Sequence, residues 1–180
     1  MIQYYFDYND SERQTLEDVV TSLLKQLVYQ IDTIPPDLEE AYDLHLHRGI
    51  RARPTINRFS DLLINCSKQF FTTVFLLIDA FDECLEARRP ELLVHLQRFY
   101  EAGLRLFLTT RSHLLHQLEK KLQCAAKLEI YAQENDVQKY LTESLQEKVG
   151  YLDDKLQHKI VERISMGVDG KYVPSTAVII

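Results

Sequence analysis

Apolar residues that recur at three- and four-residue steps predict the helices of this chain. The longest such stripe starts at Leu16 and ends before the proline pair at 35 and 36. Ser11 and Gln14 have the spacing of a capping box, which places the start of that helix just ahead of the stripe. Apolar spacing predicts further helices over 37–47, 54–66, 90–102, 113–122, 135–145 and 153–165. Prolines at 54 and 90 suit the first turns of two of them, and Gly103 suits the position after a helix end.

Short apolar and β-branched runs between these helices predict four strands, over 2–8, 72–78, 104–108 and 127–132. The second run, "TTVFLLI", is continuously apolar and does not alternate with polar residues, which is typical of a strand covered on both faces of a parallel sheet. Strands that alternate with helices predict a layered α/β domain with a largely parallel sheet and helices on both faces.

The composition fits one domain of 180 residues, with 46% hydrophobic content. A net charge of −6 argues against a nucleic-acid partner. The three cysteines are widely spaced and form no CxxC pair, so the sequence predicts neither a disulfide framework nor a zinc knuckle. With neither a signal peptide nor an apolar run long enough to span a membrane, the expected location is cytoplasmic.

Three carboxylates follow the most apolar predicted strand, in the segment "VFLLIDAFDEC": Asp79, Asp82 and Glu83. Ligands of parallel sheets bind outside the carboxyl ends of the strands, where Asp79 falls. Clustered like charges raise one another's pKa unless a cation compensates, which indicates a metal ion or a proton-handling role. Magnesium takes one or two carboxylates together with substrate phosphates. The alternative is that Asp79 only closes a turn.

Arg111 ends the next predicted strand, "LRLFLTTR". Its planar guanidinium suits bidentate binding of a phosphate. The alternative, left open by the sequence, is an ion pair with Asp79 or Asp82.

The segment "IDAFDEC" resembles the extended Walker B motif of NACHT-type NTPases of the STAND class, in the version found in nephrocystin-like N-terminal domains and many fungal NACHT proteins. "QYYFDYNDSERQT", "LRLFLTTRS" and "LEIYAQENDVQKYL" are similar to flanking segments of that family, so the resemblance covers residues 3–166. It implies a P-loop NTPase-like fold of three layers, in which a parallel sheet has helices on both faces. It also implies ATP and magnesium as ligands.

The resemblance also implies a role for each candidate residue. Asp79 would hold the magnesium ion, and Asp82 and Glu83 would orient or activate the attacking water. Arg111 would sense the γ-phosphate, with Thr110 as a nearby hydroxyl donor.

The chain has no GxxxxGK[ST] segment, and its five glycines are scattered. Compared with the family, it starts just after the phosphate-binding loop and helix. We therefore expect a partial NACHT-like domain over 1–166 with a divergent tail over 167–180. The absent strand would lie beside strand 104–108, so its loss should leave unpaired backbone groups and bare apolar surface there, and should favour self-association or protein partners.

Two functions remain open at this point. One is a nucleotide-dependent signalling switch, an ATPase by resemblance, that is weak or inactive as an isolated chain. The other is a non-catalytic adaptor that keeps the fold for protein contacts. A carboxylate-based glycosidase has no further support in the sequence. The histidine pairs at 45/47 and 113/116 fit solvated or interface side chains better than metal ligands. Arg88 and Arg89 fit surface ion pairs better than a phosphate site.

Overall fold

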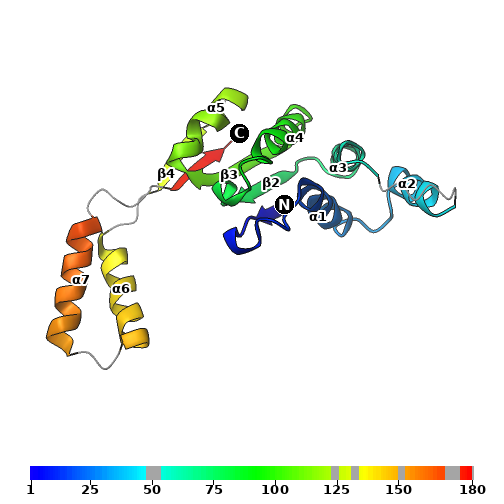
Figure 1. Cartoon of the computed structure of the whole chain (residues 1–180). Coiled ribbons are helices and arrows are strands. Elements are labelled where there is room, and N and C mark those ends of the chain that lie inside the picture. Colours follow the sequence, from blue (N-terminus) through cyan, green and yellow to red (C-terminus); the bar gives the residue numbers. More distant parts are fainter. Residues whose placement is uncertain (48–53, 123–125, 131–133, 150–152, 169–174, 180) are drawn as a thin grey trace.

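The structure, a computed structural model, describes residues 1–47, 54–122, 126–130, 134–149, 153–168 and 175–179 (Figure 1). The strands are β1 (Ile2–Tyr5), β2 (Phe75–Asp79), β3 (Arg105–Arg111), β4 (Ala126–Ile130) and β5 (Ser175–Ile179). The helices are α1 (Leu16–Val28), α2 (Pro36–His47), α3 (Ile56–Phe70), α4 (Arg89–Glu101), α5 (Leu115–Lys121), α6 (Glu134–Val149) and α7 (Asp154–Val168), with single 3-10 turns at Tyr8–Asp10, Phe81–Glu83 and Ser112–Leu114.

The strands form one mixed sheet in the order β1-β2-β3-β5-β4. The first three are parallel, and their register places Leu77 beside Gln3 on one side and Phe107 on the other. β5 is antiparallel to both of its neighbours, β3 and β4. The α/β class and its parallel core are therefore confirmed, whereas the prediction that strand 127–132 continues a parallel sheet is wrong.

β5 occupies the position beside β3 that the sequence was expected to leave open. It pairs with β3 from Phe107↔Ile179 to Arg111↔Ser175. The prediction of unpaired backbone groups at this edge is therefore wrong. Backbone N–H and C=O groups require partners, and the β-prone segment "STAVI", assigned from sequence to a divergent tail, supplies them.

Helices α1, α3, α4 and α5 cover one face of the parallel strands and share one core with them. The connections β1 to β2 and β2 to β3 step across the sheet in the same direction. Because such crossovers are almost always right-handed, both place their helices on the same face. That core contains Leu76 and Ile78 of β2 and Leu106 and Leu108 of β3, all at most 1% exposed.

The opposite face of these strands is not covered by the described helices. Phe75 is 57% exposed and Tyr5 is 53% exposed, although their neighbours along the strands are buried or half-buried. The predicted layer of helices on both faces is therefore not found in the described part of the chain. Bare apolar surface was expected beside β3, where β5 lies instead, whereas the exposed apolar residues Phe75 and Tyr5 lie on a face of the sheet.

The start of α1 differs from the sequence prediction. Thr15, not Ser11, is the N-cap, and it forms the capping box with Asp18. Gln14 instead accepts a hydrogen bond from the N–H of Asp7 at 3.1 Å, which holds the turn ahead of the helix. The end of α4 agrees with prediction, since Gly103 has φ 103° and follows the C-cap Ala102.

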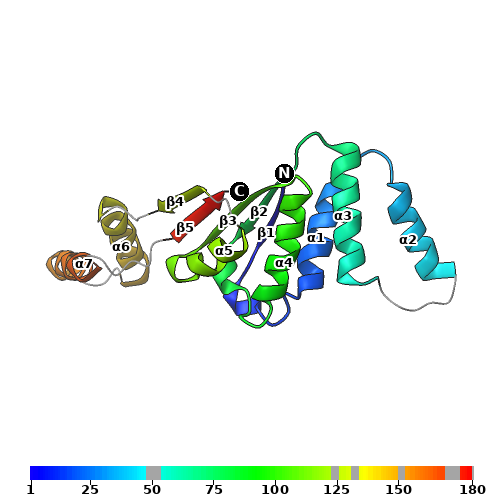
Figure 2. The same ribbon diagram turned by 90° about the horizontal axis from the view of Figure 1, so that it is seen from above.

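Helices α6 and α7 form a hairpin that stands apart from the helix layer in both views (Figures 1 and 2). The two helices pack against each other. They connect β4 to β5, so the hairpin is inserted between the two antiparallel strands.

Candidate functional site

The carboxyl end of β2 bends sharply directly after Asp79. Ala80 has φ 52° and ψ 48°, a left-handed conformation that is costly for a residue with a Cβ. Phe81 follows with its side chain fully buried and anchors the 3-10 turn Phe81–Glu83. This bend presents Asp79, Asp82 and Glu83 together at the carboxyl end of the parallel strands.

Thr109 of β3 fixes both Asp79 and the bend. Its hydroxyl donates a hydrogen bond to Asp79 Oδ1 and accepts one from the N–H of Ala80 at 2.9 Å. Sequence reasoning missed Thr109. Its signal is the period of two along β3, which places Thr109 on the same face as Phe107 and Arg111.

Thr110, the hydroxyl donor suggested by the family resemblance, lies on the other face of β3. Its side chain is 2% exposed, and its Oγ1 has no hydrogen-bond partner among the described residues. The structure does not bring Thr110 to the carboxylates. The hydroxyl beside Asp79 belongs to the preceding residue.

Arg111, the last residue of β3, meets Asp82 of the 3-10 turn that follows β2. Arg111 Nε lies 3.1 Å from Asp82 Oδ2, and the backbone N–H of Arg111 donates to Asp82 Oδ1 at 3.2 Å. The Asp82 side chain is 10% exposed and that of Arg111 is 55% exposed. The guanidinium and the acid cluster therefore share one site, and the arrangement is the ion pair that the sequence left open.

Glu83 connects the cluster to the segment after β1. Its Oε2 accepts a hydrogen bond from the N–H of Tyr8 at 2.9 Å across 75 residues of sequence. At least one oxygen of each carboxylate in the cluster thus has a partner within the chain.

Arg88 and Arg89 brace the loops around the cluster, and among the described residues their side chains bind main-chain carbonyls where surface ion pairs were expected from sequence. Arg88 donates to three carbonyl oxygens of residues 11, 12 and 14, at 2.9–3.0 Å. Arg89 donates to the carbonyls of Asp82 and Cys84 at 2.6 and 2.8 Å. Main-chain carbonyls attract these guanidiniums because the loops leave their carbonyls without secondary-structure partners.

Cys84 does not add a reactive group to the site. Burial raises the pKa of Cys84 to about 11, although Arg89 and Arg88 lower it, so its thiol stays protonated at neutral pH. The side chains of the histidine pair at 45 and 47 lie outside the described residues. Among the residues that are described, no three histidine, cysteine or acidic side chains are placed to hold a metal together.

The donors at Asp79 fit a magnesium ion on chemical grounds. A carboxylate with a neighbouring hydroxyl offers hard oxygen atoms, and magnesium keeps most of its waters, so it needs few protein ligands. A phosphate cradle of clustered glycine amides is absent from the sequence. The residues thus fit the cation, and they do not by themselves fit the triphosphate.

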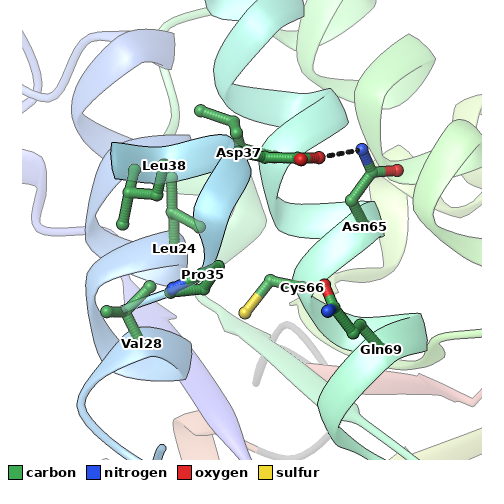
Figure 3. A pocket seen from close by; sticks show the side chains of 9 residues that line it. Leu24, Val28, Pro35, Asp37, Leu38, Asn65, Cys66 and Gln69 are labelled. Atoms are coloured by element: carbon green, nitrogen blue, oxygen red, sulfur yellow. Dashed lines mark hydrogen bonds between the residues drawn. The ribbon is translucent and has the colours of Figure 1, made fainter. Parts of the chain in front are cut away.

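Two hollows in the described structure lie away from the carboxylates. Figure 3 shows the first, between α1, α2 and α3, where Asp37 accepts a hydrogen bond from Asn65 at 2.9 Å. Its volume of about 10 Å³ is at the limit for one water molecule. The second, of about 270 Å³, is lined by Lys68, Thr72 and Gly103. These residues precede β2 and β3, at the ends of the strands away from the carboxylates. We place the candidate site at the carboxylates, because parallel sheets bind ligands at the carboxyl ends of their strands.

The fold and the site together define an α/β domain with an acid cluster and an arginine at the carboxyl end of a three-stranded parallel sheet. Comparison with protein families matches residues 1–111 to the family described as nephrocystin 3, N-terminal. The match covers more than half of the 180 residues, and the chain belongs to this family. It includes every candidate residue from Asp79 to Arg111.

Comparisons with curated proteins and with solved structures gave no significant match. In the described part of the chain, every helix is too short or too polar to cross a membrane.

Proposed function

We propose that this chain is the cation-handling and water-handling part of a nucleotide-binding signalling switch of the NACHT type, located in the cytoplasm. The observation that carries the proposal is the convergence of Asp79, Asp82, Glu83 and Arg111 at the carboxyl ends of two adjacent parallel strands. Membership in the nephrocystin 3 N-terminal family supports it, since the matched residues contain the whole cluster.

In this proposal Asp79, oriented by Thr109, holds a magnesium ion, which neutralises charge on a bound phosphate. Asp82 and Glu83 orient a water molecule, and Arg111 binds the terminal phosphate. Arg111 is more than half exposed and its partner Asp82 is nearly buried, so the guanidinium is the member of the pair that is able to turn toward a ligand.

The isolated chain should bind ATP weakly or not at all, because it has no glycine-rich loop to hold the phosphates. Titration of the purified chain with labelled ATP and magnesium measures this. A dissociation constant in the low micromolar range, about −8 kcal/mol, would contradict the expectation.

The cation part of the proposal has its own test. Paramagnetic Mn²⁺, used in place of Mg²⁺, should broaden the NMR signals of Ala80 and Thr109 first, and Asp79→Asn should abolish the broadening. Asp61→Asn is the matched control, because Asp61 is a half-exposed carboxylate paired with Arg98 at 2.7 Å away from the cluster. Equal broadening in the Asp79 variant would refute a site at this carboxylate.

A second candidate function, a non-catalytic adaptor, is favoured by the partners that the cluster already has. Both oxygens of Asp82 contact Arg111, and Glu83 contacts the backbone of Tyr8. Fusing the phosphate-binding strand, loop and helix of a relative ahead of residue 2 separates the two functions. ATP hydrolysis that appears in the fusion, and disappears with Asp82→Asn or Glu83→Gln, supports the switch. A folded fusion that binds ATP without hydrolysing it supports the adaptor.

A further inference from the structure

The uncovered face of the parallel strands carries an apolar stripe. Alternation along the strands places Phe75 and Leu77 of β2 on this face, and Phe107 is the register partner of Leu77 on β3. Phe75 and Tyr5 are more than half exposed, whereas Leu77 and Phe107 are half-buried. A parallel sheet is normally covered on both faces, so a stripe of this composition needs a covering surface.

The two connections that build the parallel sheet leave this face bare by their direction. Each steps the same way across the sheet, so each places its helices on the opposite face. The lack of covering helices on this face is therefore a property of the strand order. Side-chain rearrangement within α1, α3 or α4 does not change it.

The outer edge of β1 is already protected against strand addition. Gln26 of α1 accepts a hydrogen bond from the N–H of Gln3 at 2.9 Å and donates one to its carbonyl at 2.7 Å. A partner that paired with β1 would have to break both bonds. This favours association through the face of the sheet over association through that edge.

Charges of opposite sign lie at the two ends of the uncovered face. Arg105, exposed, is the register partner of Phe75 at the start of the strands. At their carboxyl end, Asp79 is the register partner of Tyr5, and Arg111, which lies on the same face, is paired with Asp82. When two such faces pack across a two-fold axis with their strands antiparallel, the arginine of each copy meets the acid end of the other. The face is thus complementary to itself in charge as well as in apolar character.

We propose that the uncovered face is the contact surface between two copies of this chain. Phe75, Leu77, Phe107 and Tyr5 form its apolar centre, and Arg105 of each copy faces Asp79 of the other. The dimer is isologous and buries the stripe that the strand order leaves open. This inference does not rest on nucleotide or cation binding, and a magnesium ion bound at Asp79 would compete with Arg105 of the other copy for the same carboxylate.

Sedimentation velocity of the whole chain over a wide concentration range tests the proposal. We expect a reversible monomer–dimer equilibrium, weakened about tenfold or more by Phe75→Glu, because a buried charge at an apolar contact removes more than about 1.4 kcal/mol. Tyr42→Glu is the matched control, since Tyr42 is 62% exposed on α2, far from the sheet face, and the change should leave the equilibrium unaltered. A chain that is monomeric at every concentration, or a dimer that both variants weaken equally, overturns the proposal.

The orientation of the two copies has a separate test that does not require a destabilising variant. Carbodiimide treatment of the Arg105→Lys variant, prepared as a mixture of ¹⁴N- and ¹⁵N-labelled chains, should join position 105 of one copy to Asp79 of the other. Mixed-isotope peptides with this link confirm the antiparallel packing. Links from position 105 only to acids outside the uncovered face contradict it.

Discussion

The two faces of the β1-β2-β3 sheet have the same backbone and different surroundings. On one face Leu76, Ile78, Leu106 and Leu108 are sealed under four helices. On the other face, the side chains of Phe75 and Tyr5 remain exposed although they are also largely apolar. The difference shows that burial in this protein is decided by the direction of the crossovers, because an apolar strand does not by itself specify which of its faces acquires helices.

The largest test of this comparison uses two adjacent leucines of β2. Leu76→Ala should lower the free energy of unfolding by about 3 kcal/mol, because the side chain is fully buried under the helix layer. Leu77→Ala should cost about 1 kcal/mol in dilute solution, since Leu77 is only half-buried on the other face. Urea denaturation measures both. Equal losses at low protein concentration would mean that both faces are covered.

The threonine pair of β3 sharpens the comparison at the site. Thr109→Val should destabilise by about 1–2 kcal/mol, because the hydrogen bonds to Asp79 and from Ala80 are lost and the N–H of Ala80 loses its partner. Thr110→Val should be neutral or stabilise by up to about 1 kcal/mol, because it removes a buried hydroxyl that lacks a partner among the described residues. A larger loss for Thr110→Val in the same denaturation assay would reverse the assignment of the two hydroxyls.

The helix layer should also carry a pH dependence. His95 of α4 is 3% exposed, and its Nδ1 lies 2.9 Å from Ser60 Oγ of α3. Burial lowers its pKa from 6.5, Arg98 lowers it further, and Glu91 opposes the shift. The folded state therefore binds this proton less readily than the unfolded chain, and the stability present above pH 6.5 falls as the pH drops below it, by at most about 1.4 kcal/mol per pH unit.

Denaturation midpoints measured above and below pH 6.5 test this dependence of stability on pH. His95→Leu should flatten it, because the variant has no imidazole to protonate. A slope that persists unchanged in the variant would assign the acid sensitivity to other groups.

The smallest expected effect concerns the bend at the carboxyl end of β2. Ala80→Gly should raise stability by about 0.5–1 kcal/mol, because φ 52° is strained for alanine and open to glycine. Ala102→Gly is the matched control, since Ala102 has φ −75° and should lose about 0.5 kcal/mol from the same change. If both variants lose stability, the bend at Ala80 is not strained.

The sequence allowed the residues of the candidate site and their positions at strand ends to be predicted. It did not allow the contacts between them to be predicted. Asp79, Asp82, Glu83 and Arg111 could be selected because each falls at the end of an apolar run. The bracing by Arg88 and Arg89 could not be predicted, because carbonyls left over in loops have no sequence signature. Thr109 and Thr110 could be distinguished only once the covered face was known.

The sequence by itself determined the local elements. The apolar period gave α1, α3 and α4, the run "TTVFLLI" gave β2, and Gly103 gave the end of α4, because each depends on neighbouring residues along the chain. Tertiary structure alone decided that β5 pairs antiparallel beside β3, that one sheet face stays open, and that Arg111 meets Asp82. These outcomes depend on which backbone groups and charges remain unpaired after the local elements have assembled, and that is a property of the whole chain.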